Sequence, residues 1–163
     1  VWDRLASNKF KNRKFVVTYN LHHDKNLDSY AQKIAQAKGL ELLNISYNWH
    51  DIIRPGKLVW CPSVEEYLGL IRDAEYIIAD SFHATAFSIQ FHKKFISFYP
   101  EKASIRIRDI LSKLDIPQRG TDGNATVQDI EKDIDYETVD KKLNTYRAQD
   151  RLYLEKISNS LKG

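Results

Sequence analysis

Short apolar runs that alternate with amphipathic segments constrain the fold of this chain more than any other feature. Each run is four to six residues long and consists mainly of apolar, often β-branched or aromatic, side chains, which is typical of a buried strand. The predicted strands are 15–19, 40–45, 76–79 and 95–99, and the predicted helices between them are 27–38, 63–71 and 82–92. Strands that alternate with helices form β-α-β units with right-handed crossovers. We therefore predict an α/β fold with a Rossmann-like parallel sheet sandwiched between helices.

The remainder of the chain predicts two further helices and a loop. Apolar residues at helical spacing predict a helix over 105–114, which ends before Pro117, and a long C-terminal helix over 139–162. Residues 118–133 include two glycines among small polar residues, and we predict a surface loop there. A length of 163 residues is usual for one domain, so we expect a single Rossmann-like domain over 1–163.

Composition excludes several classes of protein. The 25 Lys and Arg against 22 Asp and Glu give a formal net charge of +3, which does not imply nucleic-acid binding. The single cysteine, Cys61, excludes an internal disulfide and a cysteine zinc site, and we expect a reducing compartment. The longest segment without Asp, Glu, Lys or Arg, 81–92, is too short to span a bilayer, and the N-terminus predicts no signal peptide. We therefore expect a soluble, cytoplasmic domain without a transmembrane segment.

The densest group of candidate functional residues is Asp80-Ser81-Phe82-His83, between a predicted strand and an apolar helix. Ligands of such sheets bind at the carboxyl ends of the strands, where helix N-termini present N–H groups. Asp80 or Ser81 would cap the helix, and His83 in its first turn would lie close to a bound anion and donate a proton. The alternative, which composition alone favours, is a structural cap with a histidine that bonds a neighbouring carbonyl.

Three more candidates for ligand binding follow the first predicted strand. Tyr19 and Asn20 stand at its end, and His22 belongs to the polar loop beyond it. Adjacent histidines such as His22 and His23 rarely bind one ion, and the sequence places no third ligand. We therefore expect a loop that lines the cleft, and no metal site.

An aromatic-rich stretch lies further along the chain and contains Tyr47, Trp49, His50 and Trp60. Such rings would suit stacking on a sugar. Because aromatic side chains are more often part of the core, however, we expect to find them there.

The segment from Leu68 to Phe91, with Asp80-Ser81-Phe82-His83 at its centre and Lys94-Phe95-Ile96 after it, closely resembles the polysaccharide pyruvyl transferase family. The resemblance extends from about Phe15 to Arg119. It implies the C-terminal half of a longer, two-domain protein of GT-B-like architecture, in which two Rossmann-like halves face each other across a cleft. The other half would be the N-terminal domain of the same protein.

The resemblance also implies a reaction and the residues that perform it. The family moves a pyruvyl group from phosphoenolpyruvate to sugar hydroxyls, which forms a pyruvate ketal and releases phosphate. Carried over by position, His83 would be the proton donor or phosphate ligand, Asp80 and Ser81 its orienting neighbours, and Arg106 and Arg119 the groups that bind the donor's anionic parts. Family members often have Arg-Leu-His where this chain has Ser81-Phe82-His83, so a different donor stays open.

Our interpretation is a bacterial, cytoplasmic transferase of cell-surface or exopolysaccharide biosynthesis, with the inner face of the membrane as a second place of action. We expect no cofactor, a saccharide or lipid-linked oligosaccharide as acceptor, and little turnover by this domain alone, because catalysis needs both halves to orient the reactants. The alternatives are a GT-B glycosyltransferase with a nucleotide-sugar donor and a binding module of the same fold that has no catalytic activity.

Overall fold

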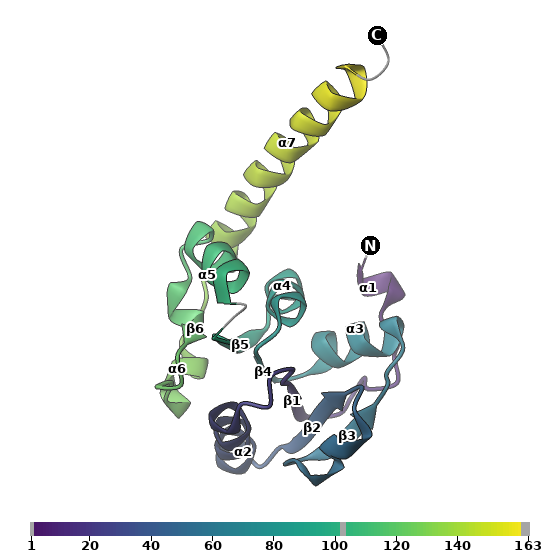
Figure 1. Cartoon of the computed structure of the whole chain (residues 1–163), viewed down its shortest axis with the longest axis vertical. Helices are drawn as coiled ribbons and strands as arrows, with labels where there is room; N and C mark the ends of the chain where they lie inside the picture. Colours follow the sequence, from purple (N-terminus) through teal and green to yellow (C-terminus); the bar gives the residue numbers. More distant parts are fainter. Residues whose placement is uncertain (1, 102–103, 161–163) are drawn as a thin grey trace.

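The computed structural model describes residues 2–101 and 104–160, and this part of the chain forms a six-stranded sheet in the order β3-β2-β1-β4-β5-β6 (Figure 1). Every pair of neighbouring strands is parallel. The strands are β1 (Phe15–Tyr19), β2 (Glu41–Ser46), β3 (Lys57–Trp60), β4 (Tyr76–Ala79), β5 (Lys94–Phe98) and β6 (Gly120–Thr121). The prediction of an α/β fold with a Rossmann-like parallel sheet between helices is confirmed.

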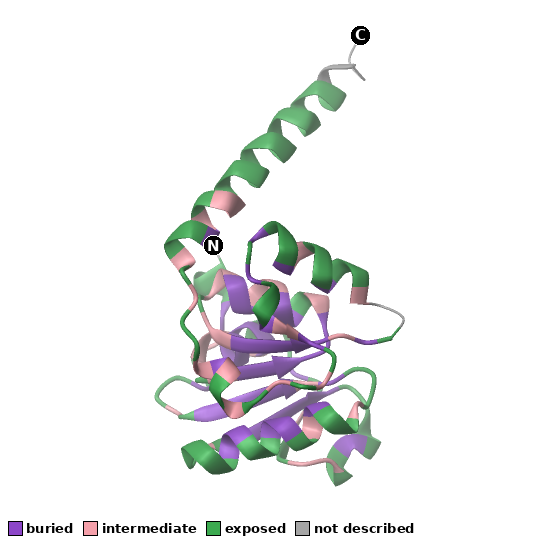
Figure 2. Ribbon diagram, turned by 90° about the vertical axis from the view of Figure 1, so that its left-hand side faces the viewer, coloured by how far each residue is buried: buried purple, intermediate pink, exposed green. Residues whose placement is uncertain are grey.

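Helices cover both faces of this sheet. They are α1 (Trp2–Leu5), α2 (Lys25–Lys38), α3 (Val64–Asp73), α4 (Phe82–Gln90), α5 (Ser104–Lys113), α6 (Val127–Glu131) and α7 (Tyr136–Ser160), and the two short 3-10 helices are η1 (Trp49–Ile53) and η2 (Pro117–Arg119). The helices α2 and α6 pack on one face, and α3, α4 and α5 pack on the other (Figure 1). The purple band of buried residues in Figure 2 follows the strands between these two layers.

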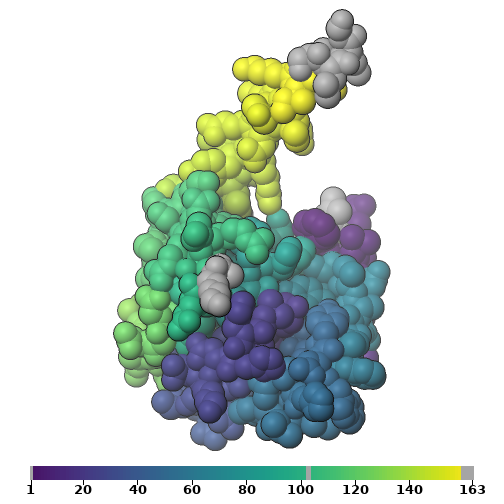
Figure 3. All heavy atoms as spheres, viewed as in Figure 1, coloured from purple at the N-terminus to yellow at the C-terminus, as the bar shows by residue number. Residues whose placement is uncertain are grey.

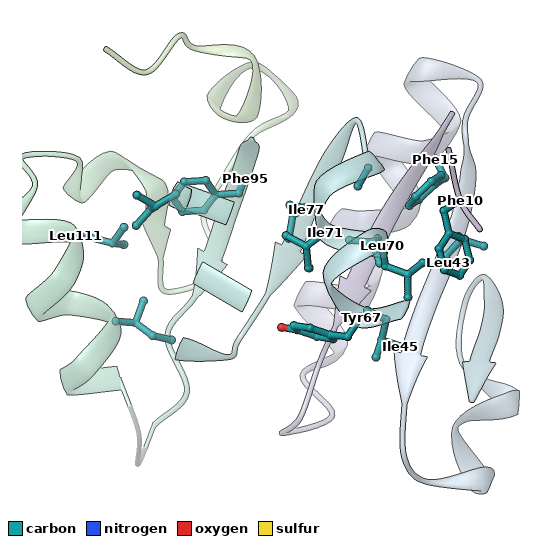
Figure 4. Close-up of a cluster of buried hydrophobic side chains, with 14 of the residues drawn as sticks. Phe10, Phe15, Leu43, Ile45, Tyr67, Leu70, Ile71, Ile77, Phe95 and Leu111 are labelled. Atoms are coloured by element: carbon teal, nitrogen blue, oxygen red, sulfur yellow. The ribbon is translucent and has the colours of Figure 1, made fainter. Parts of the chain in front are cut away.

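Alternation along the strands produces two separate cores, because successive side chains point to opposite faces of the sheet. In β1, Phe15 and Val17 belong to the core beneath α3, α4 and α5, whereas Val16 belongs to the core beneath α2 and α6. Figure 4 shows the first of these cores, with Tyr67, Leu70 and Ile71 of α3 against the strands and Leu111 of α5 beside Phe95. The buried rings and aliphatic chains hold the strand ends in fixed positions.

Two helix caps agree with the sequence pattern. Gly39 ends α2 in the left-handed conformation, with φ of 63°, which a residue without Cβ adopts at little cost. Ser63 begins α3 with a capping box: its hydroxyl accepts from Glu66 N at 3.2 Å, and the Glu66 carboxylate accepts from Ser63 N.

The structure differs from the sequence-based expectation in two segments. Residues 57–60, within the predicted loop after the second strand, form the edge strand β3, whose apolar run Leu58-Val59-Trp60 is short and only partly buried. The predicted surface loop 118–133 contains the end of η2, the two-residue strand β6 and the helix α6, whose Ile130 is buried against α2. These elements are too short for periodicity to detect.

The C-terminal helix, predicted over 139–162, is α7 over Tyr136–Ser160. Its first turns pack on the domain, where Val139 is buried and Leu143 lies against the same core. Its later turns project away from the sheet (Figures 1 and 3), and most of their described side chains are exposed.

Candidate functional site

The carboxyl ends of β1, β4 and β5 bring three polar segments to one edge of the sheet. Tyr19 pairs with Ala79, and Ala79 pairs with Ser97, so Asn20 and Asp80, which follow these strands, are neighbours. The strands that hold them are buried on both faces, and the segments that follow them reach the surface. As the sequence predicts for a parallel sheet, this edge collects most of the candidate site residues.

Asp80 is the most buried acidic group at this edge, with only 2% of its side chain exposed. Its Oδ1 accepts a hydrogen bond from Leu21 N at 2.7 Å, and its Oδ2 accepts from His22 N at 2.9 Å and lies 2.8 Å from His22 Nδ1. Asp80 therefore anchors the β1–α2 loop and the His22 imidazole. The resemblance placed Asp80 beside His83, but its polar contacts in the structure are with the loop after β1.

A second histidine and aspartate pair lies beside the first. His23 Nδ1 is 3.3 Å from Asp51 Oδ1, and the Asp51 carboxylate also accepts from Ser46 Oγ at 2.5 Å. Arg54 contacts both Asp51 and Asp28: its Nη1 lies 3.5 Å from Asp51 Oδ2, and its Nε donates to Asp28 Oδ2 at 2.9 Å. Burial lowers the pKa of Arg54, but the two carboxylates more than offset this effect, and its pKa lies above the ordinary value.

Asn20 belongs to the same polar group. Its Nδ2 donates to Asp24 O at 2.9 Å and Asp28 Oδ1 at 3.0 Å, and its Oδ1 accepts from Asp24 N at 3.0 Å. Its backbone carbonyl accepts from Arg54 at 3.1 Å. Asn20, predicted as a ligand-binding residue, thus has its side-chain groups engaged in shaping the loop. We call Asn20, Asp28, Asp51 and Arg54 the loop frame.

Tyr19 packs against the core beneath α3, α4 and α5. Its ring centroid lies 6.4 Å from that of Tyr47 and 5.6 Å from that of Tyr67. Burial is the main cause that raises the pKa of its hydroxyl, with Tyr47 and Asp80 as further causes. Tyr19 therefore lies next to the predicted site, at the edge of the hydrophobic core.

The α4 N-terminus, which we define as Ser81 and the first turn of α4, differs from the start of α3. Ser81 is buried and takes the N-cap position, but within the described residues its side chain makes no capping hydrogen bond. Its carbonyl accepts from Thr85 N and Thr85 Oγ1, both at 3.0 Å. The N–H groups of a helix's first turn have no partner inside the helix, so this end of α4 can bind an anion.

Two basic side chains lie at the α4 N-terminus. His83 is exposed and contacts the Phe82 ring at a centroid distance of 5.8 Å. The guanidinium of Arg106, on α5, lies 5.2 Å from the centre of the same ring. Phe82, the first residue of α4, thus brings together His83 and Arg106 from two different helices.

His22, Arg106 and His83, all predicted site residues, line three separate cavities. His22, Tyr99, Ser104 and Arg108 line a cavity of about 570 Å³, whose wall also contains Asp24, Asn26, Pro100, Glu101 and Asp122. Arg106 and Phe82 line a second one of about 330 Å³ between α4, α5 and α7. His83 lines a third of about 260 Å³ with Trp2, Phe87 and Arg147. His22 and His83 therefore line different cavities.

Arg108 is a basic residue at this edge that the sequence analysis did not single out. Its guanidinium lies 3.7 Å from the centre of the Tyr99 ring, and its Nη2 lies 2.5 Å from Asp122 Oδ1. It shares α5 with Arg106 two residues away, and an exposed arginine on a helix resembles any solvated surface charge in sequence.

Arg119 lies away from this group. It precedes β6, its side chain is fully buried, and its guanidinium donates to the carbonyls of Asp129 at 3.1 Å, Ile130 at 3.3 Å and Lys132. Burial lowers its pKa, an effect that Tyr136 and Tyr30 oppose. Arg119, expected to bind the donor, instead connects the end of α6 to the domain interior.

The aromatic stretch is exposed, which corrects the expectation that it belongs to the core. Trp49 is 58% and Trp60 is 56% exposed, and Tyr47 is similar. The two indole rings meet edge to face, with centroids 5.8 Å apart and an angle of 77° between their planes. They stand at the ends of β2 and β3, so this pair lies on the same edge of the sheet as the loop frame.

Among residues 2–101 and 104–160, no group of three or more His, Cys, Asp and Glu side chains is arranged to hold a metal ion. No helix in the same ranges has the length and apolar character needed to cross a membrane. The family model for polysaccharide pyruvyl transferase matches residues 3–102, which is more than half of the chain and ends before Arg106 and Arg119. Comparison with curated proteins and with solved structures finds no match.

Proposed function

Because the chain belongs to the polysaccharide pyruvyl transferase family, we propose that it binds phosphoenolpyruvate and supports transfer of the pyruvyl group to a saccharide. The product would be a ketal that joins two hydroxyls of one sugar, made during bacterial cell-surface or exopolysaccharide synthesis. Phosphoenolpyruvate is a cytoplasmic metabolite, so the reaction would take place in the cytoplasm or at the inner face of the membrane.

The observation that carries this proposal is the α4 N-terminus. The buried Ser81 makes no capping bond there within the described chain, and Arg106 and His83 stand on either side of Phe82. Phosphoenolpyruvate carries a phosphate and a carboxylate. The phosphate would accept hydrogen bonds from the first-turn N–H groups and the Ser81 hydroxyl, and Arg106 would pair with the carboxylate.

The reaction needs two protons to leave the acceptor and requires no external oxidant or reductant. The first hydroxyl oxygen bonds to C2 of phosphoenolpyruvate while a proton is added to C3, which converts the methylene into a methyl group. The phosphate then leaves with the electron pair of its C–O bond, and the second hydroxyl oxygen bonds to C2. One hydroxyl proton is thus balanced by the new methyl C–H bond and the other by the phosphate. His83 is the proposed donor of the proton to C3.

The exposed indoles of Trp49 and Trp60 fit the acceptor side of this proposal. The apolar face of a pyranose ring packs well on an aromatic ring, and the edge-to-face pair presents two exposed rings with an angle of 77° between their planes. Sugars of a saccharide chain would stack there beyond the reacting residue. We expect Trp60→Ala to weaken saccharide binding by about tenfold, whereas Ile53→Ala, which truncates an exposed apolar side chain on the same 3-10 helix as Trp49, leaves it unchanged.

A nucleotide sugar is the second candidate donor. The cavity of about 570 Å³ beside His22 is larger than phosphoenolpyruvate requires, and Ser81 stands where family members often have arginine. In that case the α4 N-terminus would hold the diphosphate, and the base would lie in the cavity.

Ligand-observed NMR on this chain with phosphoenolpyruvate and UDP-glucose tests the proposal. We expect selective binding of phosphoenolpyruvate, weakened at least tenfold in Arg106→Ala and His83→Ala. Arg13→Ala is the matched control, because Arg13 pairs with Glu41 at the amino edge of the sheet. Preference for UDP-glucose would move the protein to glycosyl transfer, and binding of neither ligand would support a module without catalytic activity.

Catalysis is expected to need the N-terminal half as well, because orientation of both reactants supplies much of the rate. This chain alone would therefore bind the donor with little turnover. Steady release of phosphate by the chain, with ketal formation, would contradict that part of the proposal and support the reaction itself.

A further inference from the structure

Two adjacent histidines of the β1–α2 loop are each held through Nδ1 by a buried aspartate. His22 Nδ1 lies 2.8 Å from Asp80 Oδ2, and His23 Nδ1 lies 3.3 Å from Asp51 Oδ1. Both aspartate side chains are more than nine-tenths buried, whereas both imidazoles are about half exposed. The same chemical pair therefore occurs twice within two consecutive residues, which allows a direct comparison of the two.

The hydrogen bonds of Asp80 determine the tautomer of His22. An ionised carboxylate only accepts hydrogen bonds, so the proton between Asp80 Oδ2 and His22 Nδ1 belongs to the imidazole. In the neutral ring Nε2 then carries the lone pair. Asp80 also accepts from the backbone N–H groups of Leu21 and His22, so the ring and its own backbone are held by one carboxylate.

The surroundings of the two pairs differ. His22 lines the cavity of about 570 Å³, a size typical of small-ligand sites, together with Tyr99, Ser104 and Arg108. His23 has a left-handed backbone, with φ of 57°, and its aspartate is part of the loop frame. A bound sugar in the cavity would therefore meet His22, whereas His23 contacts the frame.

We propose that His22 is the general base that accepts the proton of the attacking acceptor hydroxyl, and that Asp80 is its positioning residue. This inference rests on the proposed function. The O–H bond of the acceptor breaks, its proton goes to Nε2 of His22, and the oxygen's electron pair forms the bond to C2 of the donor. The Asp80 carboxylate stabilises the imidazolium that results, as in other histidine bases oriented by a carboxylate.

The proposal adds a general base to the proton donor that the resemblance assigns to His83. Asp80 directly precedes Ser81, so the dyad lies one residue from the proposed phosphate site at the α4 N-terminus. His83, on the other side of Phe82, keeps the proposed role of acid toward C3. The base then comes from the β1–α2 loop and the acid from α4, and the acceptor occupies the cavity that His22 lines.

Long-range ¹H–¹⁵N correlation spectra of the imidazoles test this inference on the chain itself, without turnover. Spectra are recorded under alkaline conditions in which imidazoles are neutral, with phosphoenolpyruvate and either methyl glucopyranoside or its fully O-methylated counterpart. The variants are Asp80→Asn and its matched control Asp51→Asn, with His22→Gln to assign the resonances.

We expect His22 to be protonated at Nδ1, and the free pyranoside to shift its Nε2 resonance, because a hydroxyl donates there. The O-methylated sugar should have no effect, and His23 should respond to neither. Asp80→Asn should abolish the fixed tautomer and the response, and Asp51→Asn should preserve both.

An Nε2-protonated His22, an equal response of His23, or a silent His22 in the presence of bound phosphoenolpyruvate would overturn the inference. If phosphoenolpyruvate does not bind and the pyranoside still shifts His22, the dyad stands and the proposed donor is wrong. The two failures are thus distinguishable.

Discussion

The loop after β1 and the turn after β4 lie side by side at one edge of the sheet, yet they use their polar groups in opposite ways. At the loop, the Asn20 side chain bonds Asp28 of α2, Arg54 after η1 bonds Asp28 and the Asn20 carbonyl, and Asp51 of η1 accepts from Ser46. At the turn, the Ser81 side chain makes no cap bond within the described chain, and His83 of α4 and Arg106 of α5 are exposed. Asp80, in the turn, bonds the loop at Leu21 and His22.

This difference separates groups that build the site from groups that can act on a ligand. A polar side chain whose hydrogen bonds are all made within the protein gives shape, because using it for a ligand would break those bonds. A group that acts on a ligand must instead be oriented by a hydrogen bond on one side and exposed to the ligand on the other. The His22 ring, which Asp80 contacts at Nδ1 and which is about half exposed, meets both conditions. The substitutions below test this division through stability and ligand binding together.

The loop frame should give the largest effect on stability. Arg54→Leu leaves the buried carboxylate of Asp51 and the largely buried carboxylate of Asp28 without their cation, and we expect a loss of about 3–5 kcal/mol in the free energy of unfolding. Urea denaturation measures the loss. Arg13→Leu removes an exposed pair with Glu41 and should cost at most about 1 kcal/mol. Equal losses in the two variants would contradict the special role of the frame.

The two arginines that the resemblance assigned to the donor should behave differently. Arg119→Met leaves one buried and two partly buried carbonyls without their donor, and we expect a loss of about 2–3 kcal/mol in stability. Arg106→Met should change stability by less than about 0.5 kcal/mol, because its side chain is exposed, and should weaken phosphoenolpyruvate binding. Urea denaturation and ligand titration of both variants test this contrast. A stable Arg119→Met variant that has lost phosphoenolpyruvate binding would show that Arg119 takes part in donor binding.

Glu131 lies at the amino ends of β4 and β5, away from the loop frame, and makes the stability of the domain sensitive to acid. Lys38 is the main cause that lowers its pKa to about 2, and Tyr76 at 2.7 Å and Lys94 at 3.0 Å from its carboxylate contribute. Because the folded-state pKa lies below the ordinary value near 4.5, the stabilisation is full above that value and is lost as the pH falls toward 2. The carboxylate is partly exposed, so we expect a contribution of about 1–2 kcal/mol.

Unfolding free energies of Glu131→Gln measured between about pH 6 and pH 2 check this dependence. The variant should be less stable than the parent chain at the upper end and nearly equal to it at the lower end. Glu137→Gln, which loses an exposed pair within α7, is the control and should show no such convergence. A difference that persists unchanged at low pH would show that charge on Glu131 is not the cause.

The smallest effects on stability should come from the two serine N-caps. Ser63→Ala removes the capping box of α3 and should cost about 1 kcal/mol. Ser81→Ala removes a hydroxyl without a cap bond and should cost less than about 0.5 kcal/mol, while it weakens phosphoenolpyruvate binding. Thermal unfolding and ligand titration of the same two variants separate the outcomes. A similar cost for both would mean that Ser81 has a structural role after all.

Periodicity sufficed to predict the main layers of the fold, because β1, β2, β4 and β5 are buried runs separated by amphipathic helices. It did not detect β3, whose residues are half exposed at the sheet edge, or β6, which has two residues and depends on its pairing with β5. Short elements of this kind are stabilised by their neighbours rather than by their own pattern.

The sequence analysis predicted where the site lies better than it predicted the contacts between its residues. Parallel strand ends place Asn20, His22 and Asp80 together in any such sheet, and the sequence analysis named them all. The pairing of Asp80 with His22 joins residues 58 positions apart and depends on the path of the β1–α2 loop, which carries no periodic signal. The interior position of Arg119 depends on α6, an element of five residues that the sequence pattern did not reveal.

A crystal structure of this chain with phosphoenolpyruvate bound tests the central claim most directly. The account predicts the phosphate within hydrogen-bond distance of Ser81 Oγ and the first-turn N–H groups of α4, with the carboxylate toward Arg106. It also predicts that the Nε2 side of His22 faces the donor. Phosphoenolpyruvate bound at Arg108 and Tyr99 with the α4 N-terminus unchanged, or bound only at a surface remote from the carboxyl ends of the strands, would contradict it.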